Sequence, residues 1–321
     1  MAGVLVTGAN GFIGSHIVEG LLQKKYQVRV LVRKTANLQW IKDLPIEIFY
    51  GAISNYEDLP PAVTDVDFII HCAGATKGKT EKDYMTANVI GTQNLLKACL
   101  NYNQTLKRFI FISTISASGP SPNNLPITET KICTPVSIYG KTKLQAESIV
   151  LEMKDKIPSV ILRLSAIYGP RDKETLAYFK FLKIGISPIF GGLVSMCYVK
   201  DVVSAIILCL EREIPSGTIY HISDGKCYNI LEIAKTAEAI LDKKTLKIKI
   251  PVVILKLYAN VVNFFSPGTS VLGPDKIKEL IQECWVCDIN KIKNEIGFMP
   301  QYNLEQGLKE TLQWYKEHHW L

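Results

Sequence analysis

Short apolar runs alternate with longer amphipathic stretches through the first half of the chain. The runs have the length of buried strands, and the stretches between them repeat with the period of helices. The strands that this pattern predicts cover residues 4–7, 27–32, 46–50, 68–72, 108–112 and 160–164. The main predicted helices follow the first strand to residue 22 and cover 84–100 and 137–154. Because alternating strands and helices form right-handed crossovers, we expect a parallel sheet with helices on both faces.

The alternation loosens after residue 164. The elements predicted there are a loop at 168–172, helices at 173–184 and 202–211, and strands at 197–199 and 218–222. The lysines and isoleucines that alternate over 247–250 predict an exposed edge strand. The predicted fold class is α/β, a Rossmann-type doubly wound parallel sheet with a smaller C-terminal substrate-binding lobe. We expect a first domain at 1–165, to which about 197–222 returns, and the lobe mainly at 166–321.

Residues 252–265 form the most apolar late segment. Its polar members Lys256, Asn260 and Asn263 recur at i, i+4 and i+7, which predicts one polar stripe on a helix. The segment is too short to span a bilayer, so we expect no stable membrane insertion. A buried helix, a pocket wall or an oligomer contact is expected, and a helix lying on a membrane surface is the alternative.

The composition suits a folded chain with a sizeable core. Its 321 residues are 47% hydrophobic, which allows one large domain or a large domain with a smaller companion. The net charge of +7 is spread along the chain without a long basic run, so nucleic-acid binding does not follow. A mild positive field would suit an anionic cofactor.

The cysteines and the first residues bear on the cellular location. Eight cysteines are scattered along the chain, and only Cys284 and Cys287 have the spacing of metal ligands, without a second such pair. We therefore predict reduced cysteines and no metal site. The first predicted strand begins at Val4, so we expect no signal peptide and a cytoplasmic location.

A glycine-rich turn follows the first strand directly. Gly8, Gly11 and Gly14 are spaced G-x-x-G-x-x-G and lead into a predicted helix. Glycines let the backbone turn sharply and approach a phosphate closely, and a helix N-terminus offers unpaired N–H groups and a positive dipole end. The stretch therefore predicts a pyrophosphate site of the dinucleotide-binding kind.

The end of the second strand bears on the choice of cofactor. An acidic residue about 20 positions past the turn would bind the ribose 2′-hydroxyl of NAD, but the strand here ends in Arg33 and Lys34. A guanidinium suits a 2′-phosphate by charge and by bidentate geometry. We therefore predict NADP(H) as the preferred cofactor, with NAD(H) as an alternative. The competing interpretation is that both residues are solvated loop charges.

Tyr139 and Lys143 lie on one face of a predicted helix, near its start. A tyrosine with a pKa of about 10 is a poor acid–base catalyst at neutral pH, and a neighbouring ammonium favours the phenolate. Ser113 and Thr114 end the preceding strand and would place a hydroxyl pair where a substrate lies. The pattern Tyr-x-x-x-Lys is common by chance, so its position in the fold gives it its weight.

Together these motifs resemble the extended short-chain dehydrogenase/reductase family, within the NAD-dependent epimerase/dehydratase superfamily. The likeness extends over nearly the whole chain. The segments that carry it are 7–14, 71–74, 88–96, 111–114, 139–143, 163–170, 198–202, 297–300, 307–308 and 314–315. The resemblance implies a nicotinamide-dependent enzyme and does not specify its substrate.

The resemblance also implies roles for the matched residues. Tyr139 would be the general acid and base, and Lys143 would hold the nicotinamide ribose and lower the pKa of the tyrosine. Thr114 would hydrogen-bond the reacting oxygen. The cofactor-binding residues predicted from the motifs and the resemblance are Gly8, Asn10, Gly11, Phe12, Ile13, Gly14, Arg33, Lys34, Ile53, Ala73, Gly74, Ser113, Tyr139, Lys143, Leu164 and Ile167.

Two positions depart from the family pattern. An acidic residue usually follows the glycine that ends the third strand and binds the adenine amino group, but Ala52 and Ile53 follow Gly51 here. Leu164 stands where many relatives have proline. Both departures concern the affinity and orientation of the cofactor and leave the catalytic residues in place.

The substrate branch is inferred from side chains that the family places around the substrate. Members acting on UDP- or dTDP-sugars usually have asparagine at the position of Ala166 and tend to have arginine at that of Val194. A diphosphate needs cations or amides around it, which these two side chains do not supply. Dehydratases place Asp-Glu after the active-site threonine, whereas Ile115 and Ser116 follow Thr114 here.

The chain therefore looks closest to the dihydroflavonol-4-reductase and 3β-hydroxysteroid-dehydrogenase branch. Its members reduce or oxidise a carbonyl or alcohol on a fairly apolar small molecule. A nucleotide-sugar epimerase or dehydratase with tightly bound NAD is the alternative, and a non-enzymatic NADP-binding regulatory protein is a second one. A homodimer through the helices beginning near Tyr84 and Ser137 would fit the family, and Asn88 is expected to bridge its helix and the fifth strand.

Overall fold

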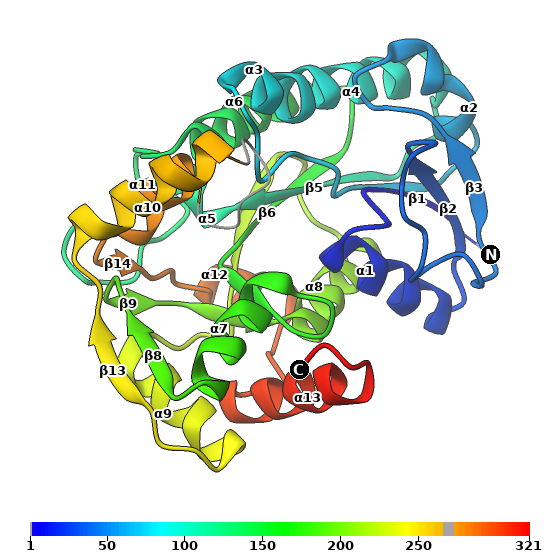
Figure 1. The fold of residues 1–321 in the computed structure, drawn as a ribbon. Coiled ribbons are helices and arrows are strands. Elements are labelled where there is room, and N and C mark those ends of the chain that lie inside the picture. Colours follow the sequence, from blue (N-terminus) through cyan, green and yellow to red (C-terminus); the bar gives the residue numbers. More distant parts are fainter. Residues whose placement is uncertain (1, 266–272) are drawn as a thin grey trace.

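The main sheet is parallel and doubly wound. The computed structural model describes residues 2–265 and 273–321, without the side chains of Lys256 and of residues 260–265. Seven strands lie in the order β11-β6-β5-β4-β1-β2-β3, and every neighbouring pair is parallel (Figure 1). The order reverses between β1 and β4, which confirms the predicted Rossmann-type fold class. The strands are β1 (Gly3–Thr7), β2 (Gln27–Val32), β3 (Glu47–Tyr50), β4 (Phe68–His71), β5 (Arg108–Thr114), β6 (Ser159–Leu164) and β11 (Thr218–Ile222).

The strands form where apolar residues follow one another without a break. β6 is buried along its whole length, and the middle of β5 is buried on both faces. A parallel sheet needs this pattern because helices cover both of its faces. Figure 1 shows α1 (Phe12–Gln23) and α8 (Val199–Glu211) on one face, and α4 (Gly91–Tyr102) and α6 (Ile138–Glu152) on the other.

The helix predicted over 84–100 extends further at both ends. It comprises α3 (Glu81–Tyr84), a π-helical segment η2 (Met85–Ile90) and α4, which follow one another directly. Thr80 caps its start, and the Asp83 carboxylate accepts the backbone N–H of Thr80 at 2.9 Å. This reciprocal capping box explains why the helix begins earlier than the apolar pattern indicates.

The second half of the chain completes the main sheet and forms a lobe beside it. β11 pairs in parallel with β6, and the lobe has its own core of Tyr168, Phe179, Tyr198 and Tyr315. The boundary at residue 165 stays a prediction. The lobe's elements are β7 (Ala166–Tyr168), α7 (Lys173–Lys183), β8 (Ile186–Ile189), β9 (Leu193–Val194), β10 (Met196–Tyr198), β12 (Tyr228–Asn229), α9 (Ile230–Leu241), β13 (Leu246–Lys249), α10 (Val252–Phe265), α11 (Pro274–Leu280), β14 (Cys284–Trp285), α12 (Asn290–Ile296) and α13 (Leu304–Glu317). The short elements of the first half are η1 (Tyr56–Asp58), α2 (Pro60–Val63) and α5 (Ile115–Ser118).

Two predictions for residues 247–265 have different outcomes. β13 is the predicted edge strand, because all its residues are exposed and, among the described strands, it pairs with β8 alone. α10 forms where a helix is predicted. Of its expected roles, a buried helix is wrong for the described side chains, and a pocket wall or an oligomer contact stays a prediction. Val253 is 76% exposed and Leu257 is 64% exposed, because only the opposite side of the helix packs against α11.

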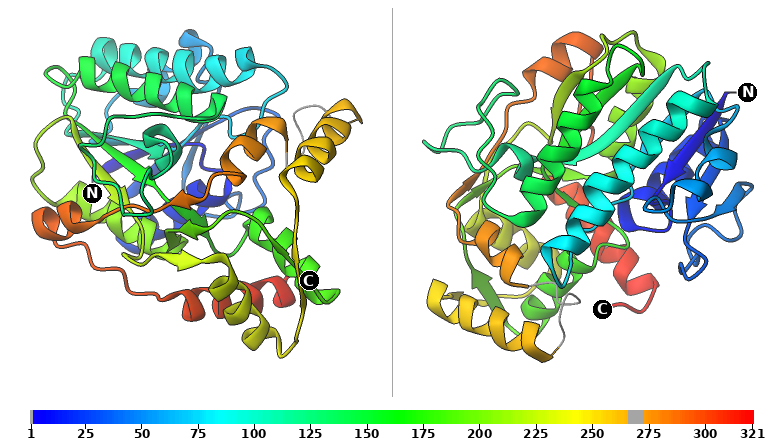
Figure 2. Two further views of the ribbon diagram at one scale, coloured as in Figure 1. Left: turned by 90° about the vertical axis from the view of Figure 1, so that its left-hand side faces the viewer. Right: turned by 90° about the horizontal axis from the view of Figure 1, so that it is seen from above.

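Figure 2 shows α10 at the margin of the molecule. No helix among the described residues combines the length and the apolarity needed to cross a bilayer. The predicted polar stripe of α10 falls on side chains outside the described ones, those of Lys256, Asn260 and Asn263.

Candidate active site

The glycine-rich turn joins β1 to α1 and packs against the loop after β4. Gly8 has a φ of +72°, and a Cβ there would lie 2.7 Å from the backbone nitrogen of Ala73. A Cβ on Gly14 would lie 2.1 Å from the carbonyl oxygen of Gly8. Both distances are too short for real atoms, so the turn requires glycine at these two positions.

The start of α1 is open to an anion. Gly11 is its N-cap, no side chain bonds to the first N–H groups, and no acidic residue lies in the first turn. Unpaired N–H groups and the positive end of the helix dipole favour an anion there. The cradle therefore fits the pyrophosphate of a dinucleotide, and the half-buried Asn10, Phe12 and Ile13 belong to the same turn.

The parallel strands bring the other predicted cofactor residues to the same edge of the sheet. Arg33 and Lys34 follow β2 and are exposed. Ala73 and Gly74 follow β4, beside the glycine turn, and the half-buried Ile53 lies in the loop after β3. Since all these loops leave carboxyl ends of strands, they surround the point where the strand order reverses.

The carboxyl end of β6 lies two strands from that of β4 in the sheet. Leu164 is buried, and Ile167 in β7 is half-buried. Ser165 stands between them with a buried hydroxyl that bonds to none of the described groups. Ser165 could not be singled out from the sequence, because hydrogen-bond partners become visible only in the folded structure.

A buried chain of hydrogen bonds starts at the glycine turn. The Thr7 hydroxyl accepts the backbone N–H of Ala73 at 3.2 Å and lies 2.7 Å from Nδ1 of His71. Nε2 of the same ring lies 3.0 Å from the Thr92 hydroxyl, which itself donates to the carbonyl of Asn88 at 2.6 Å. Burial lowers the pKa of His71 to about 3, so the ring is neutral at neutral pH. These partners require Nε2 to donate and Nδ1 to accept.

Asn88 carries this chain on to the helix α6. Its side chain accepts from the backbone of Ala75 at 2.7 Å and donates to the carbonyl of Ala75 at 3.1 Å. It also donates to the Thr142 hydroxyl at 3.0 Å, and Thr142 donates to the carbonyl of Tyr139 at 3.0 Å. The predicted bridge from Asn88 to β5 is therefore wrong, because the side chain meets the loop after β4 instead.

Ser113 and Thr114 end β5, and their hydroxyls have different partners. The Ser113 hydroxyl donates to Glu147 in α6, and Glu147 forms a buried ion pair with Arg163 at 2.7 Å. The Thr114 hydroxyl accepts the backbone N–H of Ser116 at 3.2 Å and lowers the pKa of the Tyr139 phenol. Because the Ser113 hydroxyl is buried and bonded to Glu147, the prediction that it lies beside Thr114 as a second substrate-facing hydroxyl is wrong.

Lys143 reaches from α6 to the backbone of β5. Its Nζ donates to the carbonyl of Ile112 at 2.7 Å and lies 4.0 Å from the ring centre of Phe111. Burial lowers the pKa of Lys143 to about 8, although Cys72 and Glu147 act in the opposite direction. The carbonyl and the aromatic face therefore hold this ammonium in a largely apolar place.

Tyr139 lies in the first turn of α6, beside Thr114. Burial raises the pKa of its phenol well above the ordinary value, Glu279 raises it further, and the hydrogen bond with Thr114 lowers it. Lys143 is not among the groups that contribute most to the raised pKa of Tyr139. The predicted lowering of that pKa by Lys143 is therefore not a main feature of this structure. The phenol is therefore protonated at neutral pH, which suits a proton donor.

Two carboxylates of α11 hold the start of α6, and sequence analysis missed both. Asp275 accepts the backbone N–H groups of Ile138 and Tyr139 at 2.8 and 3.0 Å. Glu279 accepts from the Ser137 hydroxyl at 2.7 Å. Negative charge at a helix N-terminus is stabilising, so the lobe fixes the turn that carries Tyr139. The carboxylates lie more than a hundred positions from their partners, and only the fold brings them together.

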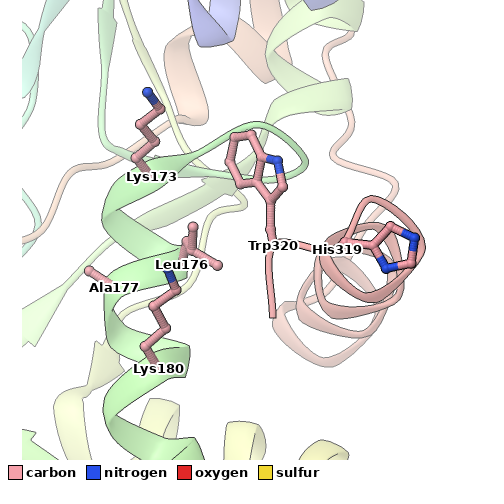
Figure 3. Close-up of a pocket in the computed structure, with 6 residues that line it drawn as sticks. All are labelled: Lys173, Leu176, Ala177, Lys180, His319 and Trp320. Carbon is pink, nitrogen blue, oxygen red and sulfur yellow. The ribbon is translucent and has the colours of Figure 1, made fainter.

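Figure 3 shows a hollow of the lobe that shares no residue with this site. It lies between α7 and the C-terminal tail, with Lys173 and Lys180 on the helix and Trp320 across from them. Among the described residues, no three His, Cys, Asp or Glu side chains gather in a way that could hold a metal ion.

The doubly wound sheet and the glycine cradle define a dinucleotide-binding protein of the Rossmann type. A model of the "NAD dependent epimerase/dehydratase family" matches residues 4–223, and the chain belongs to that family. It is thus a nicotinamide-dependent enzyme of the short-chain dehydrogenase/reductase class, acting on CH–OH groups.

Similar proteins in the family act on different substrates. The chain is 26% identical to a UDP-glucose 4-epimerase of Vibrio cholerae, over 97% of this chain and 94% of the other. It is 27% identical to a ceramide reductase of Caulobacter vibrioides, over 99% and 96%. Among solved structures, a UDP-glucuronic acid 4-epimerase of Bacillus cereus with UDP-glucuronic acid and NAD matches with a TM-score of 0.80 at 28% identity, over 98% and 99%. The likeness therefore shows the family and leaves the substrate to be argued from the site.

The neutral His71 generates a prediction about pH and stability. Its pKa falls from 6.5 to about 3 on folding, so below about pH 6.5 the unfolded chain takes up a proton that the native chain cannot hold. Stability from this group is present above that pH and is lost as the pH falls. In the wild type, His71 should account for about 2 kcal/mol of the unfolding free energy that is lost between about pH 7 and about pH 5. In His71→Gln this part of the loss should be absent, as measured by urea denaturation at both pH values.

The matched control is His319→Gln, which changes an exposed histidine at the chain end and should leave the wild-type pH dependence intact. His16 and His221 also have pKa values lowered by burial, so a smaller slope remains in the His71 variant. An unchanged slope in His71→Gln would contradict the account of the buried chain.

The contact between α11 and α6 generates a second prediction. Asp275→Ala leaves two N–H groups of the first turn without their acceptor, so the unfolding free energy should fall by about 1–2 kcal/mol. Lys278→Ala is the control, because it removes only the exposed partner that lies 3.3 Å from Asp275 and should cost under about 1 kcal/mol. Equal losses in the two variants would show that the cap on α6 is not stabilising.

Proposed function

We propose that the protein is an NADP(H)-dependent oxidoreductase that interconverts a carbonyl and an alcohol on a fairly apolar, uncharged small molecule. The observation that carries the proposal is that the start of α6 meets the carboxyl end of β5, where the Lys143 ammonium donates to the carbonyl of Ile112 at 2.7 Å and the Thr114 hydroxyl lowers the pKa of the Tyr139 phenol. That edge also holds the glycine cradle, and the buried ammonium of Lys143 belongs to the same helix as Tyr139. A proton donor, a second hydroxyl and a dinucleotide cradle on one edge support hydride chemistry at an oxygen-bearing carbon.

The residues have distinct roles in this proposal. The bound nicotinamide dinucleotide supplies or accepts the hydride. Thr114 and Tyr139 hold the substrate oxygen between them, and the Tyr139 phenol donates its proton to that oxygen during reduction. An ammonium has three donors, and Lys143 uses one on the carbonyl of Ile112, which leaves others for the nicotinamide ribose.

The cofactor-binding residues are part of the same proposal. Gly8, Gly11 and Gly14 hold the pyrophosphate, with Asn10, Phe12 and Ile13 in the turn. Arg33 and Lys34 bind the 2′-phosphate, and Ile53 lies beside the adenine. Ala73 and Gly74 would lie along the bound cofactor, and Leu164 and Ile167 would flank its nicotinamide.

The charges near Tyr139 support an uncharged substrate. Glu279 acts on the phenol electrostatically, and Asp275 binds the backbone of the same turn. Ile115, which follows Thr114, packs with Ile127 and the half-buried Trp285. Carboxylates and apolar side chains around a reacting oxygen disfavour a diphosphate and favour an apolar neutral molecule.

A nucleotide-sugar epimerase is the second candidate, because proteins of that activity are as similar to this chain as the ceramide reductase is. The apolar Val194 lies in β9 and Ala166 in β7, so neither supplies a group that would bind a diphosphate. A dehydratase would need an acid after Thr114, where Ile115 and Ser116 are buried. The non-enzymatic alternative is set aside, because the chain belongs to a family of enzymes.

A cytoplasmic location and a homodimer through α3–α4 and α6 remain proposals. Ile90, in η2 between α3 and α4, is exposed on that face, which supports a contact there.

The catalytic assignment predicts the effect of removing one hydroxyl. Tyr139→Phe should lower turnover of carbonyl substrates with NADPH by about two to four orders of magnitude, because the proton donor is lost. Tyr102→Phe changes an exposed tyrosine of α4 in the same way and should keep wild-type turnover. Near-wild-type turnover in Tyr139→Phe would rule out the proposed proton donor.

The cofactor assignment predicts a change of preference. Arg33→Asp places a carboxylate where a 2′-phosphate would bind, so the ratio of kcat/KM for NADPH over NADH should fall by about tenfold or more. Arg212→Asp makes the same change of charge at an exposed position after α8 and controls for the overall field. A ratio that is equal in both variants would exclude Arg33 as the phosphate ligand.

A further inference from the structure

The outward face of α10 is apolar. Val253, Ile254, Leu257 and Tyr258 are exposed, at 76%, 55%, 64% and 49%. With about 3.6 residues per turn, these four side chains lie on one side of the helix. Soluble monomers rarely expose a contiguous apolar surface of this kind without a partner.

The inward side of the helix is already satisfied. Leu255 and Ala259 are buried against Ile277 of α11, together with Phe190 and Ile250. Both views in Figure 2 show α10 at the edge of the lobe, away from the main sheet. The exposed side therefore lies on the periphery, where it can meet an extended surface.

The stretch of chain that contains β13 and α10 carries lysines and no carboxylate. From residue 243 to residue 274 the chain contains no aspartate or glutamate. The strand β13, which leads into α10, is exposed along its length, and Leu246 and Ile248 alternate there with lysines. Lys247 pairs with Glu238 at 2.6 Å, and Lys243, Lys244 and Lys249 are exposed. The lysines of the whole stretch are Lys243, Lys244, Lys247, Lys249 and Lys256.

We propose that α10 docks this protein on the surface of an anionic membrane, with its outward apolar face among the acyl chains and the neighbouring lysines at the lipid headgroups. An interfacial helix of this kind combines apolar burial of about 5–10 Å with electrostatic attraction to anionic lipid. The helix lies on the membrane and does not span it. The proposal goes beyond the oxidoreductase activity and does not depend on it.

Charge favours a membrane over a second copy of the chain. In a two-fold dimer this surface would face itself and bring lysines of one copy to lysines of the other, with no carboxylate in the stretch to pair with them. Anionic headgroups provide the opposite charge, and they leave lysine stems free to lie along the apolar boundary.

The same surface lies one helix away from the candidate active site. α10 packs on α11, and Asp275 of α11 binds the first turn of α6, which carries Tyr139. Docking through α10 would therefore bring that side of the lobe close to the lipid, where an apolar substrate accumulates.

The test is co-sedimentation of the full chain with phosphatidylcholine vesicles, prepared with and without phosphatidylglycerol. We expect the protein to sediment with phosphatidylglycerol vesicles and to be released by added salt. Leu257→Ser should lower the partition coefficient by about tenfold, the effect of losing one buried leucine. Lys249→Gln should lower it by about fivefold, the effect of one lysine near an anionic surface.

Leu125→Ser is the matched control, because Leu125 is 67% exposed but lies in the loop after α5, outside the α10 surface. It should partition like the wild type. Failure of the folded wild type to bind phosphatidylglycerol vesicles overturns the proposal, as does binding that Leu257→Ser leaves unchanged. Self-association that Leu257→Ser abolishes, without vesicle binding, overturns it in favour of a second copy of the chain. No turnover is measured, so these results are independent of the proposed activity.

Discussion

A neutral histidine at the carboxyl end of β4 holds the two halves of the site together. His71 receives a hydrogen bond from Thr7, at the start of the glycine turn, and donates one to Thr92. The chain of bonds then passes through Asn88 to Thr142 in α6. A charged ring could not serve, because both of its nitrogens would donate and the Thr7 hydroxyl would lose its acceptor. Burial keeps the ring neutral, and the cofactor cradle and the catalytic helix are thereby tied to one strand end.

The catalytic helix is held from a second side by the lobe. The carboxylates of α11 bind the first turn of α6, and the same contacts set the charge around Tyr139. Burial, and after it the charge of Glu279, raises the pKa of the phenol and keeps it protonated, and in the proposed function the same negative charge would disfavour an anionic substrate. In the proposed function, the position of Tyr139, its proton donation and the choice of substrate would therefore depend on one short helix, α11. Because α11 also supports α10, the outer surface of the lobe and the reaction centre share a single structural support.

Much of this arrangement could be predicted from local patterns. The apolar runs locate the strands, the glycines mark a turn that excludes any side chain at Gly8 and Gly14, and spacing places Tyr139 and Lys143 on one helix face. Contacts between distant segments could not be predicted. Nothing local links Glu279 to Ser137, and adjacency in sequence hides that the Ser113 hydroxyl is bonded to Glu147 in the interior. The exposure of Leu257 was also unpredictable, because an apolar helix has the same sequence pattern whether it is buried or lies at a surface.

The measurement that tests the central claim most directly is a thermal-shift panel on the purified chain with NADPH, NADH, UDP-glucose, UDP-galactose and dTDP-glucose. A ligand that binds only the native state raises the unfolding midpoint by mass action. An oxidoreductase for an uncharged apolar substrate should be stabilised by NADPH more than by NADH, with no further rise on adding a nucleotide sugar. A further rise with a nucleotide sugar in the presence of cofactor would contradict the account and assign the protein to the epimerases of its family.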